Sequence, residues 1–303
     1  MNKINVLITG ASGFIGKPLT KTLLSMGYKI LALSRKNQKI SNNPNINWLK
    51  ADLSNIENIK DKIRSFKPEI VIHLSWENIP IFNLDNSLKN LNNSIGFFRF
   101  ILSLNTCKKI LVSGSCLEYS KSYGMCDEDE NIVSNNYFTW AKSSLRSWLE
   151  IETLNTNCKL GWFRIFYVYG PNQRKRSLIP SLINTFIKRQ LISINNIYNA
   201  NDFIYIDDVV DAFISFLKVD GFSGIYNLGT GKTTSIIEIS YIIEKLILGS
   251  SQKTDDFLKI KSECNINKTS NFFANINKAL IDLDWKPKNS IKEGLSKTLD
   301  NYI

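Results

Sequence analysis

A glycine-rich turn follows the first apolar run of the chain and directly precedes its first helical pattern. Residues 4–9 (INVLIT) form a short apolar run that predicts a buried strand, and residues 13–26 carry apolar side chains at helical spacing. Between these two segments, Gly10, Gly13 and Gly16 fall in a G-x-x-G-x-x-G pattern. A strand, a glycine turn and a helix in this order are typical of the first unit of an α/β sheet, which restricts the chain to few folds.

The three glycines predict a loop that binds the pyrophosphate of a dinucleotide. Gly10 permits a tight turn, Gly13 lets the backbone approach the pyrophosphate, and Gly16 lets the helix lie close to the strand. The phosphates would rest at the helix N-terminus, where backbone N–H groups point outward. The expected loop residues are Gly10, Ser12, Gly13, Phe14, Ile15 and Gly16.

Short apolar runs alternate with helical patterns through residue 165. Strands are expected at 4–9, 28–33, 47–51, 69–74, 109–113 and 160–165, and helices at 13–26, 55–66, 92–104 and 137–154. Strictly alternating strands and helices, with strands that are apolar almost throughout, predict a parallel sheet covered on both faces. The expected fold class is therefore α/β, a doubly wound parallel sheet of the Rossmann type with a smaller C-terminal lobe.

The strict alternation of strands and helices ends after Gly170-Pro171. Helices are expected at 177–188, 207–218, 235–248 and 291–302, and short strands at 203–206 and 225–228. No Pro/Ser-rich linker separates the two parts, so the second lobe is expected to be interleaved with the first. We expect a dinucleotide-binding domain at 1–170, to which 200–230 contribute, and a substrate-binding lobe at 171–199 and 231–303.

Charge and cysteine content limit the classes of partner. The 38 Lys and Arg residues exceed the 27 Asp and Glu residues by 38 − 27 = 11, which favours anionic ligands. These cations are scattered, so no nucleic-acid surface is expected, and no run of eighteen apolar residues predicts a membrane helix. Five cysteines without a C-x-x-C pair, and a single histidine, His73, argue against a metal site. We expect a cytoplasmic protein with free thiols.

The residues after the second expected strand favour one dinucleotide. An acidic side chain there would bind the ribose 2′-hydroxyl of NAD(H) and repel a 2′-phosphate. The chain instead has Ser34-Arg35-Lys36, which favours NADP(H) and leaves NAD(H) possible; the alternative is a solvated basic loop. Asp52, followed by Leu53, is placed to bond the adenine, or else it caps a helix.

A second glycine pattern resembles a phosphate loop but lacks one of its residues. Residues 229–233 (GTGKT) match the end of that motif. The motif also needs a glycine five positions before the final glycine, where this chain has Tyr226. An ATPase function is therefore not expected.

Six motifs together resemble the extended short-chain dehydrogenase/reductase family, in its NAD-dependent epimerase/dehydratase branch that acts on nucleotide sugars. They are the glycine loop and the segments 113–119 (SGSCLEY), 167–171 (YVYGP), 202–209 (DFIYIDDV), 227–231 (NLGTG) and 285–287 (WKP). The resemblance implies cofactor contacts at Leu74, Ser75, Asn93, Lys142, Tyr167 and Val168, and substrate contacts at Ser115, Asn172, Gln173, Arg174 and Arg176. It also implies a nucleotide-diphosphate sugar as the substrate, and a homodimer.

The resemblance implies a catalytic Ser/Thr, Tyr and Lys, of which the chain matches two. Ser115 and Lys142 match, but the residue four before the lysine is Phe138, and Tyr137 lies one position earlier. A regular helix would place Tyr137 roughly 100° away from the required face. Three interpretations follow. A five-residue helical turn could bring Tyr137 to the same face as Lys142, or another hydroxyl (Tyr119, Tyr123, or Ser115 through a water) could donate the proton in place of the family tyrosine. Alternatively, the site binds cofactor without redox chemistry.

A second departure from the family concerns the reaction. The family's dehydratases have Asp-Glu after the Ser/Thr, whereas this chain has Cys116 and Leu117. Leucine cannot transfer a proton, so 4,6-dehydration is not expected. Within the resemblance we expect an NADPH-dependent reductase of a nucleotide-linked 4-keto-6-deoxy sugar, used in surface-polysaccharide synthesis. The alternatives are an epimerase of the same family and a non-catalytic NADP-binding subunit or sensor.

Overall fold

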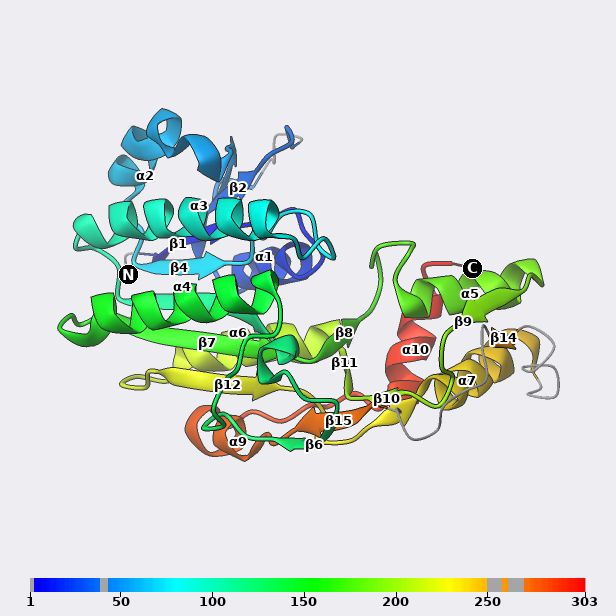
Figure 1. Cartoon of the computed structure of the whole chain (residues 1–303). Coiled ribbons are helices and arrows are strands. Elements are labelled where there is room, and N and C mark those ends of the chain that lie inside the picture. Colours follow the sequence, from blue (N-terminus) through cyan, green and yellow to red (C-terminus); the bar gives the residue numbers. More distant parts are fainter. Residues whose placement is uncertain (1–2, 39–42, 250–257, 261–269, 303) are drawn as a thin grey trace. The chain divides into compact units, whose positions relative to one another are not determined.

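The computed structural model describes residues 3–38, 43–249, 258–260 and 270–302, and its largest sheet has seven strands (Figure 1). Its strand order is β12-β7-β5-β4-β1-β2-β3. Register is parallel for the pairs β1–β2, β1–β4, β2–β3 and β4–β5. The strands are β1 (Asn5–Thr9), β2 (Lys29–Ser34), β3 (Ile46–Lys50), β4 (Ile70–His73), β5 (Lys109–Ser115), β7 (Lys159–Ile165) and β12 (Gly224–Leu228).

The chain winds in both directions from β1. Strands β2 and β3 follow on one side, and β4, β5, β7 and β12 follow on the other. The strand order therefore reverses between β1 and β4, and in sheets of this kind ligands bind at the carboxyl ends of the strands beside such a reversal. Gly10 follows β1 and Leu74 follows β4, so the predicted glycine loop lies at this reversal.

Helices cover both faces of this sheet with apolar side chains. On one face, α3 (Leu84–Ser103) and α4 (Tyr137–Leu154) lie side by side, and Phe97 and Leu145 belong to a fully buried core with Val71 of β4 (Figure 1). On the other face, α1 (Gly16–Ser25) is buried through Leu19 and Leu23. Burial of both faces explains why the strands are apolar almost throughout.

The chain forms two compact units. The first comprises 1–120, 130–164 and 210–226, and the second comprises 121–129, 165–209 and 227–303. The predicted boundaries differ at 121–129, 165–170, 200–209 and 227–230, which fall in the second unit. Residues 121–129 belong there because β6 (Tyr123–Cys126) pairs with β15 (Asn271–Ala274). The assignment of the two units to dinucleotide and substrate remains a proposal.

The second unit contains three small sheets and several helices. A four-stranded sheet has the order β13-β10-β15-β6, and β11–β8 and β14–β9 form two parallel pairs. The elements of this unit not yet given are β8 (Tyr167–Tyr169), α5 (Leu178–Lys188), β9 (Ile192–Ile194), β10 (Ala200–Asn201), β11 (Phe203–Tyr205), β13 (Thr234–Ser235), α7 (Ile236–Leu248), β14 (Leu258–Ile260), α9 (Asn277–Leu283) and α10 (Ile291–Leu299). Helix α6 (Ile206–Lys218) begins in the second unit and continues in the first from residue 210.

Two predicted helices differ from the structure, and one of the five cysteines cannot be compared. The segment 55–66 is a 3-10 helix, η1 (Leu53–Ile59), followed by α2 (Lys60–Phe66), because Asn55 within η1 and Ile59 before α2 adopt non-helical conformations. Helix α3 begins at Leu84 rather than Asn92, since the Asn83 side chain accepts the Asn86 N–H as an N-cap. Cys264 lies outside the described residues.

Candidate functional site

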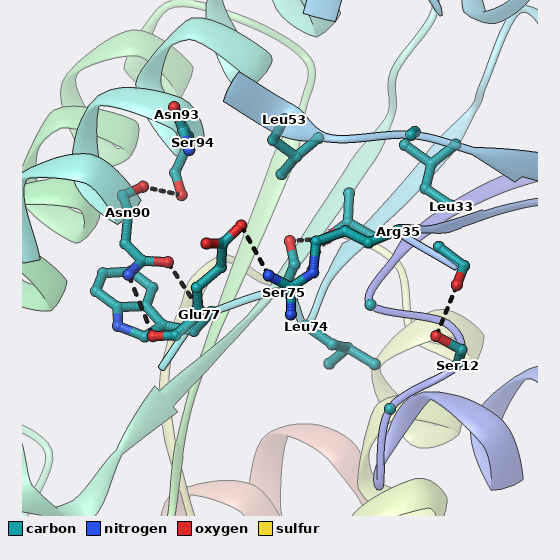
Figure 2. A pocket seen from close by; sticks show the side chains of 16 residues that line it. Ser12, Leu33, Arg35, Leu53, Leu74, Ser75, Glu77, Asn90, Asn93 and Ser94 are labelled. Atoms are coloured by element: carbon teal, nitrogen blue, oxygen red, sulfur yellow. Dashed lines mark hydrogen bonds and ion pairs between the residues drawn. The ribbon is translucent and has the colours of Figure 1, made fainter. Parts of the chain in front are cut away.

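A pocket of about 210 Å³ opens at the carboxyl ends of β1, β2 and β4 in the first unit. Nine of the predicted dinucleotide residues line it: Gly10, Ser12, Gly13, Ser34, Arg35, Leu53, Leu74, Ser75 and Asn93. Thr9, Leu33, Ala51, Trp76, Glu77, Asn90 and Ser94 complete the lining, and Figure 2 shows the side chains around the opening. Residues from five separate segments of the sequence thus converge on one pocket.

The glycine loop has the geometry that a dinucleotide loop requires. Gly10 has a φ of +70°, and a Cβ there would lie 2.9 Å from Leu74 C and Ser75 N, so only glycine fits between the ends of β1 and β4. A Cβ on Gly16 would lie 2.2 Å from Gly10 O, so the close contact of α1 with the loop also requires glycine. Both observations fit a bound pyrophosphate at the start of α1.

Arg35 lies at the mouth of the pocket and pairs with a residue that the sequence did not single out. Its NH1 is 3.2 Å from Oε1 of Glu77, which follows β4 (Figure 2). The Arg35 side chain is 60% exposed and the Glu77 side chain 16%. The pocket therefore contains both the cation predicted for a 2′-phosphate and a carboxylate from the segment after β4.

Asp52 and three of the predicted loop residues do not line the pocket. Asp52 is the N-cap of η1, where Oδ1 accepts the backbone N–H and the hydroxyl of Ser54 at 2.9 and 2.8 Å. These hydrogen bonds lower the pKa of Asp52. The Asp52 carboxylate thus caps a helix, which is the alternative given for this residue in the sequence analysis. Phe14, Ile15 and Gly16 lie at the start of α1, outside the set of lining residues.

Lys142 is buried on α4 beneath an aromatic ring. Its Nζ donates to Ser113 O at 2.7 Å and lies 4.0 Å from the centre of the Trp76 ring. Burial lowers the pKa of Lys142 to about 8, and the negative charge of Glu118 opposes this shift. Because Trp76 also lines the pocket, the lysine lies directly behind one wall of it.

Phe138 occupies the helix face on which the family has its tyrosine. It is buried, stacked on Phe82 at 4.6 Å between ring centres and edge-on to Trp76 at 5.7 Å. Helix α4 is α-helical from Tyr137 to Leu154, so the five-residue turn that could bring Tyr137 to the lysine does not occur. Tyr137 is half exposed, whereas Lys142 is buried.

Ser115 is held rigidly at the end of β5 by a capping box. Its Oγ accepts the Leu117 N–H at 3.2 Å, and its N–H donates to Oε1 of Glu118 at 2.8 Å. Of the other hydroxyls considered, Tyr119 is buried with its ring 4.5 Å from the Arg164 guanidinium, and Tyr123 is exposed on β6 in the second unit.

His73 is a buried neutral residue of β4, which agrees with a structural role. Its Nδ1 is 2.9 Å from Thr9 Oγ1 and its Nε2 is 3.1 Å from Ser94 Oγ. Complete burial, with a smaller effect from Lys142, lowers the pKa of His73 to about 3.

We predict that His73 makes the fold sensitive to acid. The unfolded chain takes up a proton near pH 6.5 while the folded chain resists it, so this contribution to stability is complete above pH 6.5 and declines toward pH 3. Between pH 7 and pH 5 the free energy of unfolding should fall by about 2 kcal/mol more in the wild type than in His73→Gln. Urea unfolding at both pH values measures this difference; equal losses in the two proteins would contradict it.

Four of the five predicted substrate residues lie in the second unit, in the loop between β8 and α5, whereas Ser115 ends β5 in the first unit. Gln173 Nε2 donates to Val168 O at 3.0 Å, and Asn172 has a φ of +65°. Arg174 and Arg176 are exposed in the same loop. Tyr167 is half-buried, with its ring 5.6 Å from that of Phe203. The structure thus groups these residues around one loop of the second unit.

The 229–231 loop holds an internal carboxylate, which explains its likeness to a phosphate loop. Buried Asp202 accepts the backbone N–H groups of Thr230 and Gly231 at 2.7 and 2.9 Å and that of Ala274 at 3.1 Å. A Cβ on Gly229 would lie 2.4 Å from the Asp202 carboxylate. The glycines therefore allow the backbone of this loop to lie against the Asp202 carboxylate.

The family model for the NAD dependent epimerase/dehydratase family matches residues 6–229. The chain is 27% identical to a dTDP-4-dehydro-6-deoxyglucose reductase of Escherichia coli, covering 98% of this chain and 97% of the relative. It is also 27% identical to a CDP-abequose synthase of Salmonella typhimurium, covering 97% of each chain.

The fold is that of a solved dTDP-glucose 4,6-dehydratase of Bacillus anthracis in complex with NAD. The TM-score is 0.84 at 20% sequence identity, and the match covers 99% of this chain and 96% of the other. The predicted doubly wound α/β fold is confirmed by this likeness and by the seven-stranded sheet. Within the described residues, no helix has the length and apolar character needed to cross a membrane. Because the family model matches more than half of the chain, the chain belongs to the NAD-dependent epimerase/dehydratase family, whose members are nucleotide-sugar epimerases, dehydratases and reductases.

Proposed function

We propose that this protein is a cytoplasmic, NADPH-dependent reductase of a nucleotide-linked 4-keto-6-deoxy sugar. The observation that carries the proposal is the position of Arg35 in the glycine-loop pocket, where it can bind a 2′-phosphate. NADPH favours net reduction over epimerisation, because an epimerase recycles its cofactor. Two relatives whose printed names describe enzymes of deoxysugar nucleotides support the substrate class.

The residues after Ser115 argue against dehydration. Cys116 is buried and Leu117 has no titratable group, so these positions supply no acid–base pair. Reduction requires only a hydride and one proton at the same carbonyl group. Bound NADPH would supply the hydride, and this chain must supply the binding, the orientation and the proton.

We assign contact with the keto oxygen to Ser115. Because Ser115 Oγ accepts the Leu117 N–H, the Ser115 hydroxyl can donate its proton to the substrate. A water molecule can then return a proton to Ser115. Tyr119 is buried against the Arg164 guanidinium, which favours Ser115 over Tyr119 as the donor. Lys142 is bonded to the carbonyl of Ser113, so its positive charge lies close to the strand end that carries Ser115.

Cofactor oxidation tests this function directly. Purified protein is incubated with NADPH and a panel of 4-keto-6-deoxy nucleotide sugars, and absorbance of NADPH is followed. Substrate-dependent oxidation with a 4-hydroxy product supports the proposal. A product of altered stereochemistry without oxidation would indicate an epimerase instead.

A non-catalytic dinucleotide-binding protein is a second candidate, which the burial of Phe138 against Phe82 and Trp76 favours. This candidate predicts cofactor binding without turnover of any member of the panel. The variant Phe138→Tyr distinguishes the possibilities: a large gain in turnover indicates a decayed enzyme, whereas a loss indicates that the phenyl ring shapes a working pocket.

We predict that activity depends on the charge of Lys142. Since its pKa is lowered to about 8, the ammonium loses its proton as pH rises through 8, well below the range of an ordinary lysine. The value of kcat/KM should therefore fall about tenfold for each pH unit above 8. A pH profile of wild type measures this, and a flat profile between pH 7 and 10 would contradict it.

We further propose that the protein forms a homodimer through α3 and α4. Four exposed aromatic or aliphatic residues follow one face of α4 at spacings of three or eleven residues: Tyr137, Trp140, Ile151 and Leu154. Such a stripe on a surface helix is typical of a face that another chain covers. Sedimentation of the wild type beside Ile151→Asp tests the proposal.

A further inference from the structure

An ion pair joins two sides of the dinucleotide pocket. Arg35 comes from the end of β2 and Glu77 from the segment after β4, and β1 lies between these strands in the sheet. Figure 2 shows the two side chains meeting at the pocket, with Ser12 on one side and Asn90 on the other. The second carboxylate oxygen of Glu77, Oε2, is 3.1 Å from Nζ of Lys89 on α3. Glu77 thus has two cationic partners.

The position of Glu77 is set by its backbone rather than by these ion pairs. Its N–H donates to Asn90 Oδ1 at 2.7 Å, and its carbonyl accepts from Asn90 Nδ2 at 3.3 Å. Asn90 is itself buried and bonded to Asn86 O at 2.7 Å. Because Asn90 clamps the main chain on both sides, a change confined to the Glu77 carboxylate should leave the local fold intact.

An entering dinucleotide would meet the Arg35–Glu77 ion pair at the mouth of the pocket, which has a volume of about 210 Å³. The Arg35 side chain is exposed and the Glu77 side chain is mostly covered, so the arginine is the partner that is free to move. An incoming 2′-phosphate would compete with the Glu77 carboxylate for the same guanidinium.

We propose that Glu77 is a specificity-determining residue of the dinucleotide site, acting by exchange of ion-pair partners. A 2′-phosphate takes Arg35 from Glu77, and Lys89 keeps the Glu77 carboxylate paired afterwards. When the dinucleotide lacks the phosphate, Glu77 accepts the ribose 2′-hydroxyl, which is the role of the acidic residue that is missing after β2. The proposal rests on the proposed function only in requiring that a nicotinamide dinucleotide binds this pocket.

The exchange predicts opposite effects on the two dinucleotides. In Glu77→Gln, Arg35 has no carboxylate to leave, so the Kd for NADPH should fall about two- to fivefold. The same variant loses a charged acceptor for the ribose hydroxyl, so the Kd for NADH should rise about tenfold. In Lys89→Gln, Glu77 is left without its second partner after the exchange, so the Kd for NADPH should instead rise about two- to fivefold while that for NADH stays unchanged.

Calorimetric titration of NADPH and NADH into the full chain tests the proposal. Glu69→Gln is the matched control, because Glu69 precedes the same strand, β4, at its other end and pairs with Lys108 at 2.9 Å, away from the pocket. It should leave both Kd values at the wild-type level. In Arg35→Gln, adding Glu77→Gln should no longer improve NADPH binding.

The outcomes separate this inference from the proposed function. A ratio of the two Kd values that is the same in wild type and Glu77→Gln would overturn the partner exchange while leaving the dinucleotide site in place. Binding of neither dinucleotide by wild type would overturn the proposed function as well. Thermal unfolding of each variant checks that Asn90 still holds the segment, because a Tm equal to that of wild type shows an intact fold.

Discussion

Replacement of Glu118 by alanine is expected to lower the free energy of unfolding by about 3–5 kcal/mol, because it leaves a buried arginine without its carboxylate. Glu118 is fully buried and accepts from Trp162 Nε1 at 3.1 Å and from Arg164 Nε at 3.2 Å. It also accepts the Ser115 N–H, so the variant should lose activity beyond its loss of stability. Urea unfolding measures the first effect and kcat the second.

A double variant separates the charge from the packing. If loss of the carboxylate beside Arg164 is the cause, then Glu118→Leu combined with Arg164→Leu should recover a large part of the stability, since buried ion pairs can often be exchanged for apolar groups. Activity should not recover, because Ser115 still lacks its partner. A loss below about 1 kcal/mol in Glu118→Ala, the value for an exposed pair, would contradict the account.

Substitution of Gly16 by alanine is expected to weaken dinucleotide binding and to lower kcat/KM by about a hundredfold, the effect on rate of a displacement of about 1 Å. The added Cβ would lie 2.2 Å from Gly10 O and 2.8 Å from the Ala11 backbone, so α1 and the loop must move apart. Overpacking of this kind also costs about 1–3 kcal/mol of stability.

Gly96 offers a matched control for this substitution. It lies within α3, and a Cβ there would have nothing within 4 Å. Gly96→Ala should therefore leave binding unchanged and add about 0.5–1 kcal/mol of stability, as alanine does within a helix. Titration of NADPH into both variants decides the matter: equal affinities in the two would refute the proposed role of the loop.

The sheet and the glycine loop could be predicted because their signals are local. Apolar runs such as 70–73 reflect burial on both faces, and the pattern of Gly10 and Gly16 reflects close contacts between consecutive elements. Of the short strands of the second unit, β11 is predicted at 203–206, but most of the others could not be predicted. Strand β6, for example, exists because it pairs with β15, almost 150 residues later in the sequence.

At the candidate site, too, some residues could be identified from local sequence signals and others only from the fold. Arg35 could be identified because it directly follows a strand that the periodicity predicts. Glu77 and Trp76 could not, because their relevance depends on where the segment after β4 places them relative to Arg35 and Lys142. A carboxylate soon after the fourth strand was the available signal for Glu77, and only the strand order shows that this segment reaches the end of β2.

The claim that supports all the others is that the glycine-loop pocket binds NADPH with Arg35 on its 2′-phosphate. Titration of NADPH into wild type and Arg35→Gln tests it most directly. We predict one site per chain and a rise in Kd of about tenfold or more in the variant, with NADH affinity nearly unchanged. Equal NADPH affinity in the two proteins, or no binding by wild type, would contradict the account.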